Sequence, residues 1–172
     1  SLSHWVMGGA WFMNHDPASA IESLQTAIRL NPSLSGAYLS LGQLQAFTGN
    51  PKEALRSLDT AMRLSPSDPA TWAMMIVKAV AFGIMGEFEE AERWARRSIR
   101  QPNAGPHPSV THLAMLGHLG RSEGAELIKK EFRENHPEFL TAKVHLRHAL
   151  FGGYKIARDL ISDGLRKAGL PE

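Results

Sequence analysis

The sequence predicts an all-α protein, a solenoid in which antiparallel helix pairs stack side by side. Two observations lead to this fold. Within residues 35–68, two runs of apolar residues at helical spacing flank the turn residues Thr48-Gly49-Asn50-Pro51. The pattern then returns at a nearly constant interval. Its small residue recurs at separations of 34, 37, 34 and 32 residues, as Ala20, Ala54, Ala91, Ala125 and Ala157, and its closing proline recurs as Pro32, Pro66, Pro102 and Pro137.

Residues 35–68 show how each pair is encoded. Asn50 is a good N-cap, and Pro51 suits the first position of a helix, where its missing N–H costs nothing. The apolar residues of the second helix recur on one face, at Ala54, Leu58 and Ala61. The dipeptide Ser65-Pro66 then ends that helix. The stretch therefore predicts a helix, a turn and a second helix.

These residues and spacings resemble those of tetratricopeptide-repeat (TPR) proteins. In the first unit, the residues at the family's signature positions are Met7, Gly8, Trp11, Ala20, Leu24, Ala27 and Pro32. In the second unit they are Tyr38, Leu41, Gly42, Ala54, Leu58, Ala61 and Pro66. The chain departs from the pattern at His4, where the family has Trp, and at Gln45, where it has an aromatic residue. The resemblance implies a right-handed TPR α-solenoid.

The register of the repeats makes the chain a single array. We expect repeats at residues 1–34, 35–68, 69–105 and 106–137, followed by a degenerate capping helix pair at 138–172. The first helix, residues 2–14, is unusually apolar, which indicates either a missing upstream repeat or a partner surface. Because the sequence begins inside this helix, we expect it to be a fragment of a longer protein.

The third repeat is the exception to the period. From Trp72 to Ala91 it spans three residues more than the second repeat does from Tyr38 to Ala54, so we expect its first helix to be about one turn longer. That helix is apolar almost all round, which places it at the centre of the array or in a protein contact. The remaining helices are expected at residues 18–30, 89–100, 110–119, 123–134, 139–150 and 155–167.

The composition is that of a globular protein, with 43% hydrophobic and 21% charged residues. The net charge is only +2, because 19 basic residues nearly balance 17 acidic ones. Cysteine is absent, which excludes disulfides and thiolate metal sites. The longest apolar run, residues 72–85, contains Lys78 and is too short to span a bilayer. We expect no membrane segment in this chain and a cytoplasmic location, or a periplasmic one if a transmembrane segment precedes the array.

The sequence predicts no catalytic, metal or cofactor site. It has no phosphate loop, no HExxH motif and no nucleophile elbow. His145 and His148 share a helix face, but no second pair of ligands stands at a metal-binding spacing. One helix is opened by glutamates and closed by a stripe of arginines, an order that complements the helix dipole, so we expect no nucleic-acid partner. The stripe comprises Arg93, Arg96, Arg97 and Arg100.

A narrower similarity covers the last hundred residues. Three short segments, residues 86–100, 119–125 and 164–172, are similar to TPR arrays attached to bacterial class III adenylate/guanylate cyclases and to winged-helix transcription regulators. This resemblance implies an effector domain upstream of the chain. The chain itself contains no cyclase nucleotide-binding or metal-binding motif.

What remains is a surface for protein partners. In TPR proteins the first helix of each pair lines a concave groove, and positions 2, 5, 9, 12 and 13 of each repeat face the ligand. By this register the groove residues are Trp5, Phe12, Met13, Leu39, Gln43, Phe47, Ile76 and Val80. The lysines and asparagines with which TPR chaperone cofactors clamp a peptide carboxylate are missing. The resemblance therefore implies a non-catalytic interaction module whose ligand is an apolar peptide or helix.

Two other interpretations stay open. The apolar groove residues can instead pack against one another or against an upstream repeat. Alternatively, the array is a self-association scaffold that dimerises through its apolar helices and brings upstream effector domains together. Charged substitutions in the groove distinguish these functions, because they abolish ligand capture but leave an end-to-end dimer intact.

Overall fold

The computed structural model of the chain describes residues 16–140 and 154–171. Within these ranges every regular element is helical: α2 (Pro17–Leu30), α3 (Ser35–Phe47), α4 (Pro51–Leu64), α5 (Thr71–Ile84), α6 (Phe88–Ile99), α7 (His107–His118), α8 (Ser122–Asn135), the 3-10 helix η1 (Pro137–Leu140) and α10 (Lys155–Lys167). The predicted helices at residues 2–14 and 139–150 lie wholly or largely outside the described residues. The other predicted helices are confirmed, each with bounds within three residues of the expected ones.

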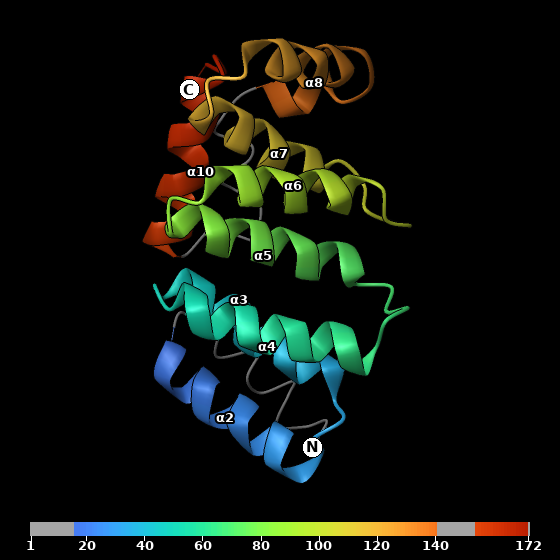
Figure 1. Cartoon of the computed structure of the whole chain (residues 1–172), viewed down its shortest axis with the longest axis vertical. Coiled ribbons are helices and arrows are strands. Elements are labelled where there is room, and N and C mark those ends of the chain that lie inside the picture. Colours follow the sequence, from blue (N-terminus) through green and yellow to red (C-terminus); the bar gives the residue numbers. More distant parts are fainter. Residues whose placement is uncertain (1–15, 141–153, 172) are drawn as a thin grey trace.

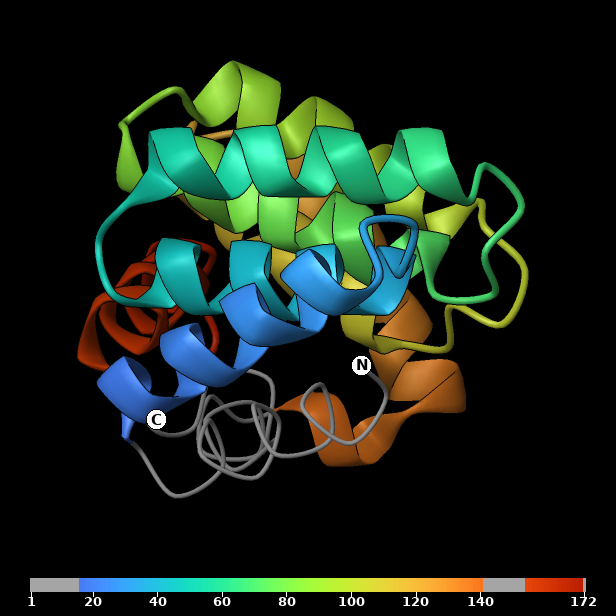
Figure 2. The same ribbon diagram turned by 90° about the horizontal axis from the view of Figure 1, so that it is seen from below.

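Helices α2 to α8 stack in the order of the chain (Figure 1). α3 packs against α4 and α5 against α6 within pairs, while α4 meets α5 and α6 meets α7 between pairs. The first helices of successive pairs, α3, α5 and α7, also contact one another and form an inner layer, which α4 and α6 cover on one side (Figure 2). This arrangement confirms the predicted all-α solenoid of antiparallel pairs.

Glycine closes the first helix of each pair where the chain turns back. Gly49 after α3 has φ +89° and Gly86 after α5 has φ +78°, a region that costs other residues energy. The amide that follows each glycine reaches back to a carbonyl near the helix end: Asn50 N–H donates to Gln45 at 2.8 Å, and Glu87 N–H to Phe82 at 3.0 Å. This is the Schellman pattern, which satisfies carbonyls at the helix end and sets the return direction.

The helix starts agree with the predicted caps in part. Asp16 precedes α2 and accepts a hydrogen bond from the amide of Ser19 at 3.2 Å, as an N-cap should. Asn50 occupies the N-cap position of α4, but its side chain donates to Thr48 Oγ1 at 3.3 Å and makes no capping bond. The predicted role of Asn50 is thus right in position and wrong in the bond that it makes.

The three extra residues of the third repeat lie mainly in the loop before α5, because the turn glycines Gly49 and Gly86 align Trp72 with Ser35 and not with Tyr38. α5 has 14 residues and α3 has 13, so the expected extra turn of helix is wrong. The linker before α5, residues 65–70, is instead longer than the linker before α3, residues 31–34. Lengthening a surface loop costs little entropy.

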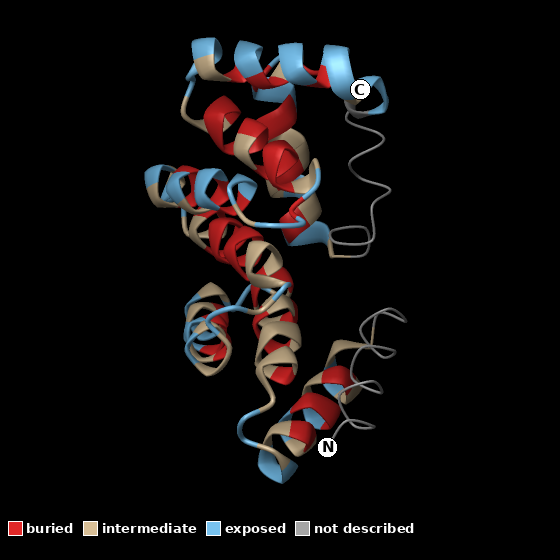
Figure 3. Ribbon diagram, turned by 90° about the vertical axis from the view of Figure 1, so that its right-hand side faces the viewer, coloured by how far each residue is buried: buried red, intermediate tan, exposed pale blue. Residues whose placement is uncertain are grey.

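The recurring alanines lie where helices cross. Ala20, Ala54 and Ala91 are fully buried, and Ala125 and Ala157 are at most 2% exposed. The buried faces of the stacked helices meet along the inside of the array (Figure 3). Gly42 shows how close the approach is, because a Cβ added there would lie 2.8 Å from Leu58 Cγ. These small residues let the backbones of paired helices approach each other, as the sequence pattern indicates.

The last helix takes a position that differs from an end cap. Its bounds are those predicted, residues 155–167, but it contacts α7 most extensively and also reaches α5 and α3. α10 therefore runs across the C-terminal ends of the inner-layer helices instead of stacking on α8 as the next layer (Figures 1 and 2). The physical reason is that Gly83 and Gly117 on the inner layer leave room for α10 to approach closely.

Candidate protein-binding groove

The predicted groove residues differ in exposure. We call the face of α3, α5 and α7 that points away from α4 and α6 the groove face. Leu39 and Gln43, one turn apart on α3, are both partly exposed. Phe47 is 1% exposed, and Ile76 and Val80 on α5 are fully buried within the core. Trp5, Phe12 and Met13 lie outside the described residues.

The inner layer is almost free of charge. α3 and α7 contain no Asp, Glu, Lys or Arg, and α5 contains only Lys78. The ammonium of Lys78 turns to the outer layer, where it donates to Asp59 of α4 at 2.6 Å and lies 3.8 Å from the Trp94 ring centroid of α6. The groove face therefore presents apolar and uncharged polar side chains to whatever packs on it.

A line of small residues crosses the inner layer at the same repeat position. Ala46, Gly83 and Gly117 each stand three residues before the glycine of the turn, on α3, α5 and α7 respectively. α10 lies over this line: a Cβ added to Gly83 would meet Leu160 Cδ2 at 2.9 Å. A Cβ added to Gly117 would lie only 1.9 Å from the carbonyl oxygen of Gly164. At that crossing the backbones of α7 and α10 are in direct contact.

Polar contacts hold the middle and the C-terminal end of α10. His118 Nε2 donates to the Leu160 carbonyl at 2.9 Å, and its ring stacks on Phe88 with centroids 4.4 Å apart. At the helix end, Lys129 of α8 donates to the Ala168 carbonyl at 2.8 Å. A lysine there satisfies a terminal carbonyl and complements the negative end of the helix dipole.

The N-terminal half of α10 is held mainly by aromatic and apolar contacts. The rings of Tyr154 and Phe47 have centroids 6.0 Å apart. Tyr154 also packs against both apolar clusters, the main core and the smaller one between α2 and α3. Ile156 reaches Gly49, whose added Cβ would lie 3.0 Å from Cδ1, yet Ile156 remains 44% exposed. The groove face thus packs the apolar side of an amphipathic helix from this same chain.

A buried polar cluster lies between α6, α7 and α8. The Glu92 carboxylate, only 7% exposed as a side chain, bonds to His112 Nε2 at 2.7 Å. Two guanidiniums, those of Arg96 and Arg121, approach it at 3.6 Å. Burial lowers the pKa of His112, against the raising effect of the Glu92 carboxylate. The cluster compensates a buried charge and ties three helices together.

The burial of His112 predicts that the stability of the fold decreases in mild acid. Because the pKa of folded His112 lies below its ordinary value of 6.5, the unfolded chain binds more protons below that pH, and stability decreases as the pH falls. The loss is at most about 1.4 kcal/mol per pH unit for one group. Thermal midpoints measured at pH 7.5 and 5.5 should differ more for the native chain than for His112→Gln. An equal decrease in both would contradict this assignment.

Three of the four arginines of the stripe make contacts within the fold. Arg93 pairs with Glu90, Arg96 approaches Glu92, and the Arg97 guanidinium lies 4.6 Å from the Trp94 ring centroid. Among the described residues, no group of three or more His, Asp or Glu side chains could hold a metal ion. His145 and His148 fall outside those residues.

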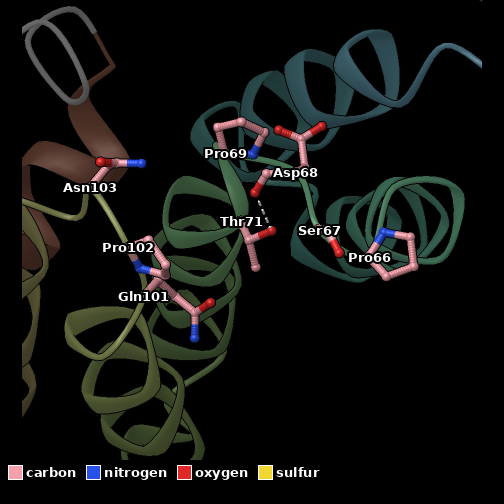
Figure 4. Close-up of a pocket in the computed structure, with 8 residues that line it drawn as sticks. All are labelled: Pro66, Ser67, Asp68, Pro69, Thr71, Gln101, Pro102 and Asn103. Atoms are coloured by element: carbon pink, nitrogen blue, oxygen red, sulfur yellow. Dashed lines mark hydrogen bonds between the residues drawn. The ribbon is translucent and has the colours of Figure 1, made fainter.

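A cleft lies between the two inter-repeat loops that follow α4 and α6 (Figure 4). Its lining residues are Pro66, Ser67, Asp68, Pro69, Thr71, Gln101, Pro102 and Asn103. The Asp68 carboxylate accepts from the Ala70 amide at 2.8 Å and from the Ser35 hydroxyl at 3.2 Å. The Thr71 hydroxyl donates to the Asp68 carbonyl at 2.7 Å. These groups stabilise the long loop before α5. We therefore interpret the cleft as the space left between two packed repeats.

The repeat register assigns Gly83 and Gly117 to the groove, but sequence reasoning selected neither of them, nor Gly164, as site residues. The first two stand at a groove-facing repeat position, and their lack of a side chain was the available signal that another backbone approaches there. The third interrupts the apolar side of an otherwise well-patterned helix. A glycine in a helix interior costs stability, so a packing role was the expected reason for it.

Comparison with known proteins agrees with this geometry. Two tetratricopeptide-repeat family models match the chain, one over residues 12–77 and one over residues 75–97. The crystal structure of MamA is similar with a TM-score of 0.66 at 18% sequence identity, covering 94% of this chain and 91% of that chain. No curated protein matches in sequence. No helix in the described part of the chain is long and apolar enough to cross a membrane.

The family matches and the helix pairs cover different lengths of the chain. The matched residues, 12–97, include α2 to α6 except for the last residues of α6. α7 and α8 continue the same helix–turn–helix geometry beyond them, and the structural match to MamA extends over nearly the whole chain. The chain therefore carries tetratricopeptide repeats and folds as a TPR solenoid.

Proposed function

We propose that this array is a non-catalytic module that binds an apolar peptide or amphipathic helix of another protein on its groove face. TPR arrays use their concave surfaces for protein binding. The observation that carries the proposal is α10: the inner layer already packs the apolar side of an amphipathic helix across α3, α5 and α7. A surface shaped for one such helix suits ligands of the same kind.

The chemistry of the groove face favours an apolar ligand. With Lys78 turned to the outer layer, the inner helices offer no fixed charge to pair with an acidic or basic peptide. Leu39 and Gln43 are the described groove residues that remain partly exposed, and the proposed surface extends to Trp5, Phe12 and Met13. Gln43 can donate and accept hydrogen bonds, which suits the backbone of a bound peptide.

A charge placed in the groove is expected to abolish partner capture. In affinity capture from a lysate of the source cells, Leu39→Glu should lose the proteins that the native chain retains, because burying a carboxylate under an apolar ligand is costly. Leu127→Glu is the matched control, since Leu127 is 67% exposed on α8, outside the groove. Circular dichroism should show both variants as helical as the native chain. Equal capture by all three proteins would contradict the proposal.

The alternative is self-association, with the array dimerising to bring upstream effector domains together. This hypothesis rests on the narrower sequence resemblance to arrays attached to cyclases and winged-helix regulators. The comparisons with known proteins given above do not include such arrays. It predicts a dimer in light scattering that Leu39→Glu leaves intact. A partner captured through Leu39 by a monomeric chain would favour the groove function over this alternative.

A further inference from the structure

We propose that α10 is a built-in competitor for the groove, and that the partner is an amphipathic helix carrying a small residue where α10 carries Gly164. This inference rests on the proposed function and names both its partner class and its regulation. α10 occupies the C-terminal ends of the inner-layer helices. A partner helix that uses this part of the groove must displace it.

The contacts of α10 define the pattern that the groove accepts. Leu160 fills the space left by the missing side chain of Gly83. Gly164, one turn later, meets Gly117 backbone to backbone, and a Cβ on Gly164 would lie 2.4 Å from the Ala114 carbonyl oxygen. Ala168 follows after another turn, and its amide nitrogen would lie 2.8 Å from a Cβ on Gly117. A fitting helix therefore has a large apolar residue, then small residues four and eight positions later.

The contacts of α10 differ along its length, and its start is more exposed than its C-terminal half. His118 bonds to the middle of α10, at Leu160, and the C-terminal half has the glycine crossing and the buried side chain of Leu165; just beyond the helix lie the Lys129 hydrogen bond to Ala168 and the buried Leu170. The N-terminal half buries Ala157 and packs Leu160 against Gly83, but at its start lie the Tyr154 ring contact and Ile156, which is 44% exposed. The partly exposed residues Leu39 and Gln43 stand on α3, the helix that the more exposed start of α10 reaches. A competing helix gains its first contacts there and displaces α10 from its N-terminal end.

Covalent attachment gives α10 a large advantage over a free helix. A tethered segment acts at an effective concentration of about a millimolar. The apparent affinity for a free helix is reduced by the fraction of chains whose groove is vacant. The native chain should therefore bind a free copy of its own α10 weakly, and a chain whose α10 cannot dock should bind that copy well.

The first test uses a fluorescent synthetic peptide of residues 154–171 and measures its anisotropy on titration with two full-length proteins. Gly164→Leu in the protein should prevent docking of its own α10, and its affinity for the peptide should exceed that of the native chain by about tenfold or more. A peptide that itself carries Gly164→Leu should bind neither protein. Equal affinities of the two proteins, or no binding by a folded Gly164→Leu chain, would overturn the proposal.

A second design does not depend on the stability of Gly164→Leu. The chain has no cysteine, so Gly83→Cys with Leu160→Cys places one engineered disulfide between α5 and α10. Oxidation should abolish peptide binding by locking α10 in place, and reduction should restore it. Binding that is indifferent to oxidation, with the disulfide confirmed by mass spectrometry, would contradict competition by α10. If partner capture nevertheless depends on Leu39, the proposed function survives while this inference fails.

Discussion

Gly117→Ala is expected to destabilise the protein strongly, although it adds a single methyl group. That methyl carbon would lie 1.9 Å from the Gly164 carbonyl oxygen and 2.8 Å from the Ala168 nitrogen. Both obstacles are backbone, so α7 and α10 must separate. Overpacking of this kind costs about 3 kcal/mol, which lowers the thermal midpoint of a chain of this size by about 6–12 °C. Circular dichroism melting measures the change.

Gly124→Ala is the matched control for that substitution. Gly124 is also helical, but its added Cβ would meet a movable side-chain end, Leu116 Cδ1, at 3.3 Å. Alanine is also the better helix former, by about 1 kcal/mol. We therefore expect a midpoint close to that of the native chain. Similar losses for the two alanine variants would show that the Gly117–Gly164 crossing is not a tight contact.

Phe47→Ala is expected to destabilise the fold, although the repeat register places Phe47 among the ligand-facing residues. Its side chain is 1% exposed and packs against Tyr154 with ring centroids 6.0 Å apart. Removing a buried phenylalanine costs about 3–5 kcal/mol through lost burial and the cavity left behind. Urea unfolding followed by circular dichroism should show a clear decrease in the midpoint concentration.

Leu39→Ala is the comparison for Phe47→Ala, because Leu39 lies two turns earlier on the same face of α3 and is partly exposed. It should shift the urea midpoint much less. A shift as large as that of Phe47→Ala would mean that Leu39 is a core residue, which would remove the clearest described contact of the proposed ligand. The pair of variants thus separates the packed part of the groove face from the part offered to a partner.

Much of the fold follows from local signals in the sequence. Ala54 and Ala91 mark the helix crossings because only a small residue allows paired backbones to approach. Gly49 and Gly86 end the inner helices because the backbone there has left-handed φ angles, which glycine adopts easily and most other residues do not. The period of the repeats then fixes which helices are neighbours, and the all-α solenoid follows without knowledge of distant contacts.

The site was harder to predict from the sequence, because a repeat position indicates the direction of a side chain but not which other residues cover it. Ile76 and Val80 stand at repeat positions that the register assigns to the groove, yet both are fully buried, whereas Leu39 and Gln43 on α3 are partly exposed. The bounds of α10 were predictable from its apolar periodicity. The position of α10 across α3, α5 and α7 depends on Gly83 and Gly117, which are distant from it in sequence.

We propose that a protein ligand binds on the groove face formed by α3, α5 and α7. Amide hydrogen exchange of the native chain, alone and with the partner retained through Leu39, tests it most directly. The account predicts slower exchange in α3 on binding, faster exchange in α10 as it is displaced, and no change in α8 around Leu127. Protection confined to α4, α6 and α8, with α3 and α10 unchanged, would contradict it.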